Sequence, residues 1–258
     1  MTVLTEQAAD AAIVAAATTL ALPTVRAQAA QIADAAARDQ LTHRGYLAEL
    51  LATEVDDRTE RRRARRIREA HFPRLKHLNE FDTTISPIDP ATIGTLTQGN
   101  FIKAGTPVVF LGDSGTGKTH LMIGTGIAAC HTGLSVRYTT AAGLVNELVE
   151  AQDEHTLSRL VGRYGRLDRL LIDELGYLHL DPRGAELLFQ VITEREERAS
   201  IAVATNAPFS EWAATFTDPR LCSAIIDRLT FKANIIETGT DSYRLAATTR
   251  TAKTGTTK

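Results

Sequence analysis

The chain has 258 residues, with 29 Lys and Arg against 31 Asp and Glu, which leaves a formal charge of −2. Hydrophobic residues make up 43% and charged residues 23%, the proportions of an ordinary globular domain. These values exclude a chain that is disordered throughout, and they indicate one large domain or two small ones with a sizeable core. Aromatic residues are only 5%, so the core is predicted to be aliphatic.

Cysteine and hydropathy patterns exclude further classes of protein. Cys130 and Cys222 stand far apart with no Cys or His motif around them, so neither a disulfide scaffold nor a structural zinc site is expected. The Ala-rich segment 8–22 contains Asp10, and its apolar run is too short to cross a bilayer. We therefore expect an Ala-rich helix or a loose arm over residues 1–19, and a cytoplasmic protein.

Residues 20–82 are predicted to form a small all-α domain. Between residues 27 and 72 there is no Pro, and apolar residues recur at spacings of three and four, which is typical of a helix. Thr42 is the expected N-cap of that helix, and Phe72-Pro73 is expected to end it. A polar, Pro-punctuated stretch over residues 83–92 is the predicted linker.

Residues 93–245 are predicted to form an α/β domain. Short β-branched apolar runs alternate there with helical stretches, which predicts a parallel sheet flanked by helices on both faces. The tail over residues 246–258 is small and polar and is expected to be disordered. The five predicted strands are residues 107–111, 134–139, 169–173, 201–205 and 234–237.

The strongest motif is GDSGTGKT at residues 112–119, which matches the phosphate-binding loop (P-loop) pattern G-x-x-x-x-G-K-[ST] between a predicted strand and a predicted helix. The backbone N–H groups of such a loop cradle phosphate oxygens at a helix N-terminus. Lys118 is expected to bridge the β- and γ-phosphates, and the Thr119 hydroxyl to hold Mg²⁺. The residues predicted to bind ATP are Gly112, Asp113, Ser114, Gly115, Thr116, Gly117, Lys118, Thr119 and His120.

A second motif is the acidic pair that ends the strand RLLID at residues 169–173. The carboxyl ends of parallel strands meet at one edge of the sheet, so the pair should lie beside the P-loop. Asp173 is then expected to hold Mg²⁺ through water, and Glu174 to activate the attacking water. The second acid favours a hydrolase over a kinase, although an acidic pair taken alone could be a solvated strand end.

For four polar residues further along the chain, the sequence allows both a functional and a purely structural role. Asn206, at the end of the fourth predicted strand, could reach the γ-phosphate or could simply form a turn. An arginine that enters a neighbour's nucleotide site stabilises transition-state charge, whereas most arginines form surface ion pairs. The candidates for such an arginine are Arg220, Arg228 and Arg244.

The basic residues cluster between Arg58 and Lys76, where nine Lys and Arg face two Glu, a local charge of 9 − 2 = +7 that leaves −9 for the rest. A helical stripe of like charges is explained by a polyanion, held through phosphate contacts without sequence readout. The alternative is a solvated helix face paired with Glu54, Glu60 and Glu69. The predicted DNA-binding residues are Arg58, Arg61, Arg62, Arg65 and Arg66.

With these residues in place, the chain resembles the IstB-type helper ATPases of insertion sequences, which are related to DnaC-type helicase loaders within the AAA+ class. The resemblance runs from about residue 20 to residue 245. It is carried by YLAELLATE (46–54), FPRLKHLNEFD (72–82), GDSGTGKTHL (112–121), LIDELGYLHLD (171–181) and DRLTFKANIIETGTDSYRL (227–245).

The resemblance implies roles for residues that spacing alone leaves open. Asn206 matches the sensor-1 position, Arg228 the arginine finger that acts in trans, and Arg244 the sensor-2 arginine, with Arg220 as the alternate. It also implies self-association through the ATP site, assembly with ATP on double-stranded DNA with low sequence specificity, and a transposase as partner. Asp113-Ser114 departs from the Pro-Pro that is common in this loop.

Two other functions share the same ATPase residues. A replicative helicase loader would have the same core, and the arginine stripe and FPRLKHLNEFD favour transposition over it. A structural ATP-binding protein with little turnover is disfavoured by the acidic pair.

Overall fold

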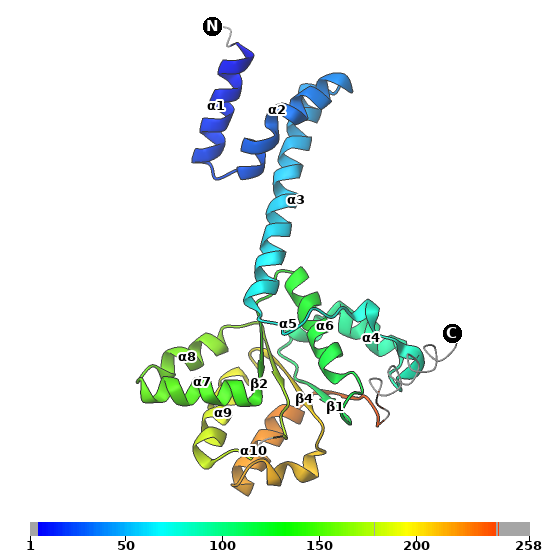
Figure 1. Cartoon of the computed structure of the whole chain (residues 1–258), viewed down its shortest axis with the longest axis vertical. Coiled ribbons are helices and arrows are strands. Elements are labelled where there is room, and N and C mark those ends of the chain that lie inside the picture. The colour runs from blue at the N-terminus through cyan, green and yellow to red at the C-terminus, as the bar shows by residue number, and fades with distance from the viewer. Residues whose placement is uncertain (1–4, 178, 241, 243–258) are drawn as a thin grey trace, which may run out of the picture. The chain divides into compact units, whose positions relative to one another are not determined.

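The computed structural model describes residues 5–177, 179–240 and 242 of the chain. The chain divides into two compact units, residues 1–65 (unit 1) and 66–258 (unit 2), and Figure 1 shows the helices and strands of both. None of the helices within the described residues is long and apolar enough to cross a membrane.

Unit 1 is built from helices, as the sequence predicts. The Thr42 hydroxyl accepts the N–H of Gly45 at 3.1 Å, which is the N-cap expected from the sequence. A small apolar cluster around Val25 and Leu50 joins the helices. The helices are α1 (Glu6–Thr19), α2 (Pro23–Arg38) and α3 (His43–Glu69), the last of which continues into unit 2.

A buried carboxylate holds α3 against the start of α2. Glu54 is 3% exposed, and its Oε2 accepts the N–H groups of Thr24 at 2.8 Å and Val25 at 3.2 Å. Its Oε1 pairs with Arg58 at 3.3 Å and Arg61 at 3.2 Å. Burial alone would raise the pKa of Glu54, but the two N–H groups and the two guanidinium groups outweigh burial and lower it.

Unit 2 contains a five-stranded sheet in the order β2-β3-β4-β1-β5, in which each neighbouring pair is parallel. This confirms the predicted fold class, a parallel α/β sheet flanked by helices and preceded by helices. Each strand lies within two residues of its predicted bounds. The strands are β1 (Val108–Leu111), β2 (Val136–Thr140), β3 (Arg169–Asp173), β4 (Ser200–Thr205) and β5 (Asn234–Glu237).

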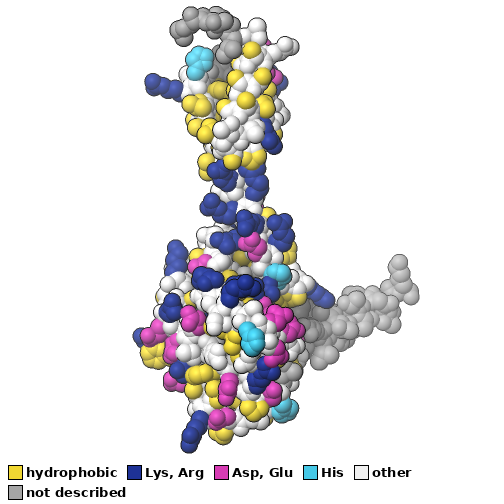
Figure 2. Space-filling model, turned by 90° about the vertical axis from the view of Figure 1, so that its left-hand side faces the viewer, with side chains coloured by type: hydrophobic (Ala, Val, Ile, Leu, Met, Phe, Trp, Pro, Cys, Tyr) yellow, Lys and Arg dark blue, Asp and Glu magenta, His cyan; other side chains and the backbone are white. Residues whose placement is uncertain are grey.

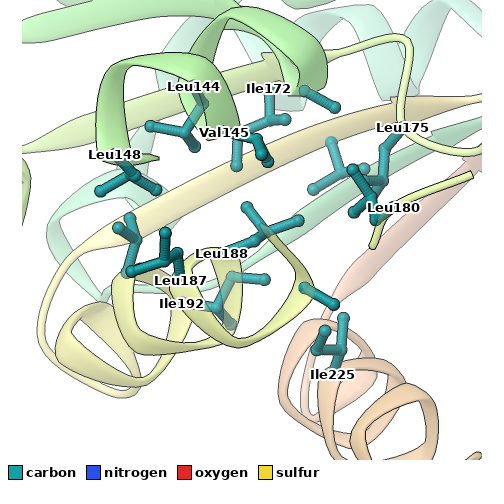
Figure 3. Packing of buried hydrophobic residues seen from close by; sticks show 14 of the residues in the cluster. Leu144, Val145, Leu148, Ile172, Leu175, Leu180, Leu187, Leu188, Ile192 and Ile225 are labelled. Carbon is teal, nitrogen blue, oxygen red and sulfur yellow. The ribbon is translucent and has the colours of Figure 1, made fainter. Parts of the chain in front are cut away.

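Side chains of the central strands alternate between two apolar clusters, one on each face. Leu170 and Ile172 of β3 point to one face and Leu171 to the other. On the first face the strands pack against the helices that follow β2 in the chain, and Figure 3 shows leucine side chains of α7 and α9 together with Ile172 and Ile225. These helices are α7 (Ala141–Asp153), α8 (Leu157–Gly165), α9 (Pro182–Arg195), η3 (Phe209–Ala214) and α10 (Pro219–Thr230).

The opposite face is covered by α6 and by the segment that follows α3. Leu78 and Ile88 of this segment are buried in that cluster, which is why residues 70–88 belong to unit 2. The two compact units divide at residue 65, inside α3, and the stretch over residues 83–92, which is predicted to be a linker, lies within unit 2. The elements here are η1 (Leu78–Glu80), η2 (Thr83–Ile85), α4 (Pro90–Gln98), α5 (Asn100–Lys103) and α6 (Lys118–His131).

Both cysteines are free and buried. Burial raises the pKa of the Cys130 thiol to about 12, so the thiol stays protonated and unreactive at neutral pH. The predicted tail over residues 246–258 lies outside the described residues.

Replacing Glu54 by Ala is expected to lower the stability of unit 1 by about 1–3 kcal/mol, because two N–H groups and two arginines lose their acceptor. Hydrogen exchange of the α2 amides in the full chain measures this. Glu49→Ala, at an exposed carboxylate of the same helix, is the matched control and should change stability by less than about 0.5 kcal/mol.

The role of Glu54 can also be tested by comparing the acid sensitivity of the wild type with that of Glu54→Ala. Folding lowers the pKa of Glu54, so the ionised carboxylate stabilises unit 1 fully at a pH above 4.5, the ordinary pKa of the group. This contribution to stability is lost as the pH falls through the lower pKa of the folded state. Equal acid sensitivity in the wild type and in Glu54→Ala would contradict this role.

Candidate nucleotide-binding site

The P-loop runs from the end of β1 to the start of α6, as predicted, and its glycines have backbone conformations that other residues rarely adopt. Gly115 has φ +87° and Gly117 has φ +101°. A Cβ added at Gly117 would lie 2.7 Å from Cε2 of Phe81, and one at Gly112 would lie 2.4 Å from the Thr238 hydroxyl. The loop therefore needs glycine for its backbone and for its close neighbours.

Lys118 begins α6 and lies folded over the P-loop. Its side-chain Nζ donates to the carbonyl oxygens of Gly112 and Asp113, each at 2.7 Å. The residue is only 9% exposed, so its ammonium is held close to the loop's backbone. A cation in this position can turn from carbonyl oxygens to phosphate oxygens, which attract it more strongly.

The two predicted acids occupy different environments at the end of β3. Asp173 is buried, and its Oδ2 accepts a hydrogen bond from the Thr119 hydroxyl at 2.8 Å. Its Oδ1 accepts the N–H of Glu174 at 2.9 Å. Glu174 is exposed, and its backbone has φ +60°, which is unfavourable for any residue other than glycine. The structure thus brings together Thr119 and Asp173 and leaves the Glu174 carboxylate open to solvent.

Tyr138 is a member of this site that sequence reasoning missed. Its hydroxyl donates to the same Asp173 Oδ2 at 2.9 Å. Burial raises the pKa of Tyr138 well above its usual value, and the charge of Asp173 adds to the rise, so the hydroxyl remains a donor. The available signal was an aromatic residue inside a predicted strand, but only the pairing of β2 with β3 places that residue beside Asp173.

Asn206 follows β4 at the same edge of the sheet. Thr205, the last residue of β4, accepts the N–H of Gly112 at 3.4 Å, which ties this strand end to the start of the P-loop. The Oδ1 atom of Asn206 is buried and has no hydrogen-bond partner among the described residues. A buried acceptor without a donor is costly in protein interiors, so this atom is available for a ligand or a water molecule.

Residues distant in sequence form the walls of the P-loop. The hydroxyls of Thr116 and Thr238 lie 2.5 Å apart, and Asp113 donates its N–H to the carbonyl oxygen of Gly239 at 3.0 Å. On the other side, the Phe81 ring meets the ring of His120 edge-on at 5.5 Å. Residues between η1 and η2 and residues just after β5 therefore flank the loop.

The candidate arginines lie elsewhere. Arg228 is near the C-terminal end of α10, where its Nε pairs with Glu196 at 3.0 Å and its guanidinium stacks on Phe189. No described contact joins it to the P-loop of its own chain. Arg220 is exposed near the start of α10. Arg244 lies outside the described residues.

Two of the five predicted DNA-binding arginines hold unit 1 together. Arg58 donates to the carbonyl oxygen of Ala21 at 2.7 Å and pairs with Glu54, which Arg61 also contacts. Arg62 is exposed and has no ion pair with a described carboxylate, and Arg66 lies 3.9 Å from Glu69. Figure 2 shows Lys and Arg side chains crowded along this stretch of α3.

The sheet, the P-loop and the acid pair define an ATP-binding P-loop protein of the AAA+ class. Solved structures support this fold. The replication initiator DnaA bound to AMPPCP and single-stranded DNA superposes with a TM-score of 0.55 at 22% identity, over 69% of this chain and 54% of that chain. This chain therefore spans about half of that protein. A DnaC helicase loader gives a TM-score of 0.51 at 17% identity, over 63% of this chain and 96% of the loader.

Within that class, the chain belongs to the family of IstB-like ATP-binding proteins, whose family model matches residues 15–251. Its relatives include the ATP-binding protein of insertion sequence IS5376 from Geobacillus stearothermophilus, 35% identical over 88% of this chain and 90% of the relative. The ATP-binding protein of insertion sequence IS21 from Pseudomonas aeruginosa is 34% identical over 81% of this chain and 80% of the relative.

Replacing Lys118 by Ala is expected to weaken ATP binding roughly 10- to 100-fold, because a hydrogen bond to a charged group contributes about 1.5–3 kcal/mol. Binding of a fluorescent ATP analogue to the full chain measures the change. Lys103→Ala removes an exposed lysine at the end of α5 and serves as the control. Similar affinities for the two variants would contradict the role of Lys118.

Proposed function

We propose that this protein is an ATP hydrolase of an insertion sequence, which self-associates through its ATP site, binds double-stranded DNA and assists a transposase in the cytoplasm. The observation that carries the proposal is the contact of the P-loop hydroxyl of Thr119 with the buried carboxylate of Asp173, beside an exposed second acid. Family membership supplies the insertion-sequence context.

The residues present fit ATP with Mg²⁺. The glycine backbone leaves room that a Cβ would fill, and N–H groups of the loop and of the start of α6 supply donors for phosphate oxygens. Lys118 would bind the phosphates, and the Thr119 hydroxyl and the Asp173 carboxylate supply the hard oxygen ligands that Mg²⁺ prefers. The ion, when bound, neutralises charge on the phosphate oxygens.

Glu174 is the group that would take a proton from the attacking water. Glu174 is exposed at the edge of the sheet, one residue beyond Asp173. The hydrogen bond from its backbone N–H to Asp173 Oδ1 holds its backbone, and so its Cα atom, in place. The unpartnered Oδ1 of Asn206 can orient the same water by accepting a hydrogen bond from it. Turnover then requires both side chains at one edge of the sheet.

Arg228 supports a site shared between subunits. It has no described contact with its own P-loop, and its guanidinium is already oriented by Glu196 and Phe189. We place it in the nucleotide site of a neighbouring copy, where its charge would stabilise the transition state. Arg220 is the alternate residue for this role, and Arg244 would contact the γ-phosphate as the sensor-2 arginine.

DNA binding is supported by the basic stretch on α3. Arg58 and Arg61 also pair with Glu54, whereas Arg62 is exposed and has no ion pair with a described carboxylate, so Arg62 is the first candidate among the five arginines for a phosphate contact. A transposase is the expected partner because the relatives are named as ATP-binding proteins of insertion sequences.

Replacing Glu174 by Gln is expected to leave ATP binding intact and to lower the hydrolysis rate at least about 100-fold, since a general base contributes typically 10²–10⁴. Because bound ATP then persists, the variant should form larger particles on duplex DNA than the wild type does. Phosphate release and light scattering, each with and without DNA, measure both effects. Glu186→Gln, at an exposed glutamate of α9, is the control.

Normal turnover in Glu174→Gln would reject Glu174 as the base, and an absence of ATP-dependent particles would reject self-association. The partner is tested by mixing the Glu174→Gln protein with the transposase of its own element and with a replicative helicase. Retention of the helicase alone would identify a loader.

Replacing Tyr138 by Phe is expected to raise the Mg²⁺ concentration for half-maximal ATP binding roughly fivefold, because the Asp173 carboxylate loses a hydrogen bond that contributes about 1 kcal/mol. A magnesium titration of ATP-analogue fluorescence measures it, with Tyr46→Phe in unit 1 as the control. An unchanged magnesium dependence would show that Thr119 alone positions the carboxylate.

A further inference from the structure

Unit 2 has a cavity with several charged side chains in its lining, at the opposite edge of the sheet from the P-loop. It has a volume of about 450 Å³ and lies beside the start of β2, which is an outer strand of the sheet. Its lining comes from three parts of unit 2: the last turn of α3, the start of β2 and the helices α7 and α8. The charged residues among them are Arg66, Glu69, His71, Arg137, Glu147 and Arg163.

The acids of this cavity are already engaged. The Glu147 carboxylate pairs with Arg163 and accepts the hydroxyl of Tyr164, so both of its oxygens are used. Glu69 lies 3.9 Å from Arg66. Counted together, three arginines face two glutamates, and His71 adds a further nitrogen donor.

Arg137 is the arginine without a carboxylate. It is half-buried, and no ion pair joins it to any carboxylate of the described residues. Its Nε atom is buried and has no hydrogen-bond partner there. The Tyr164 hydroxyl lies near its guanidinium, but a neutral phenol does not balance the charge. A partly buried cation of this kind is stabilised by an anion entering the cavity.

The surroundings point to a phosphate group of a nucleic-acid backbone. The cavity has no glycine loop and no helix N-terminus of the kind that binds a free nucleotide, since its lining is the end of α3, a strand and helix sides. The Ser135 side chain, which could contact a base, is instead bonded to Asp168 at 2.6 Å. Arginines that can fork onto phosphate oxygens, without groups that read a base, position a backbone and do not select a sequence.

We propose that the cavity at the start of β2 is a phosphate site for the DNA backbone, in which Arg137 is the central ligand and Arg66 and Arg163 flank it. The site rests on the proposed DNA binding and extends it from α3 into the ATPase unit. Arg66 is the member of the predicted arginine stripe that lines the cavity, so one helix contributes to both surfaces.

The test measures the affinity of the full-length protein for a short mixed-sequence duplex over a series of salt concentrations. Arg137→Gln should weaken binding several-fold and reduce the slope of log affinity against log salt by about one, the value for one lost phosphate contact. Arg137→Lys should restore part of both. Arg183→Gln, at an exposed arginine of α9 that pairs with Asp153, is the matched control and should change neither.

A second variant is expected to tighten DNA binding, so it tests the proposal even if Arg137→Gln does not fold. Glu147→Gln keeps acceptor and donor atoms for Tyr164 but frees the charge of Arg163, so binding should become several-fold tighter. Binding of an ATP analogue should remain at the wild-type level in every variant, because the lining of the cavity includes no residue of the P-loop and neither of the acids Asp173 and Glu174.

Unchanged affinity and slope in both Arg137→Gln and Glu147→Gln, with binding weakened by Arg62→Ala, would overturn the inference and leave the proposed function standing. A wild-type protein that does not bind the duplex would overturn both. If Arg137→Gln loses binding to a poly-glutamate peptide but keeps its DNA affinity, the cavity recognises a protein, and the inference is wrong.

Discussion

A hydrogen bond of 2.8 Å between the Thr119 hydroxyl and Asp173 Oδ2 joins the two halves of the nucleotide site. Thr119 lies in the first turn of the helix after the P-loop, and Asp173 ends a buried strand that is two positions away from β1 in the sheet. The bond exists only if β3 and β1 have the correct order and register around β4. The sheet therefore acts chiefly as a frame that sets the distance between a hydroxyl and a carboxylate.

Unit 1 shows a different use of charge. Glu54 is buried between two helices because two backbone N–H groups and two arginines satisfy its oxygens. The arginines that hold the helices are neighbours in sequence of those proposed to bind DNA. A run of like charges on α3 is thus tolerated partly because the buried carboxylate of Glu54 offsets the charge of Arg58 and Arg61 at its start.

Much of the fold could be predicted from sequence, since buried parallel strands appear as short β-branched runs and the P-loop has a strict pattern. All five strands, and the place of the P-loop between a strand and a helix, are predicted correctly in this way. The packing of Leu78 and Ile88 against the sheet does not show in the sequence, because the stretch around them is largely polar and only tertiary contacts bury these two side chains. Tyr138 and the pairing of Glu54 with α2 also escaped prediction, since both depend on contacts between residues about 30 or more positions apart.

The wall of the P-loop has a consequence for how the protein matures during synthesis. Thr116 contacts Thr238, a residue 122 positions later, and Gly112 leaves no room for a side chain because this later segment crosses it. A nascent chain thus exposes its nucleotide motif on the ribosome long before the segment that encloses it has been translated. The loop has all of its walls only once β5 has joined β1, so the order of synthesis makes the enclosed site one of the last parts of the sheet to form.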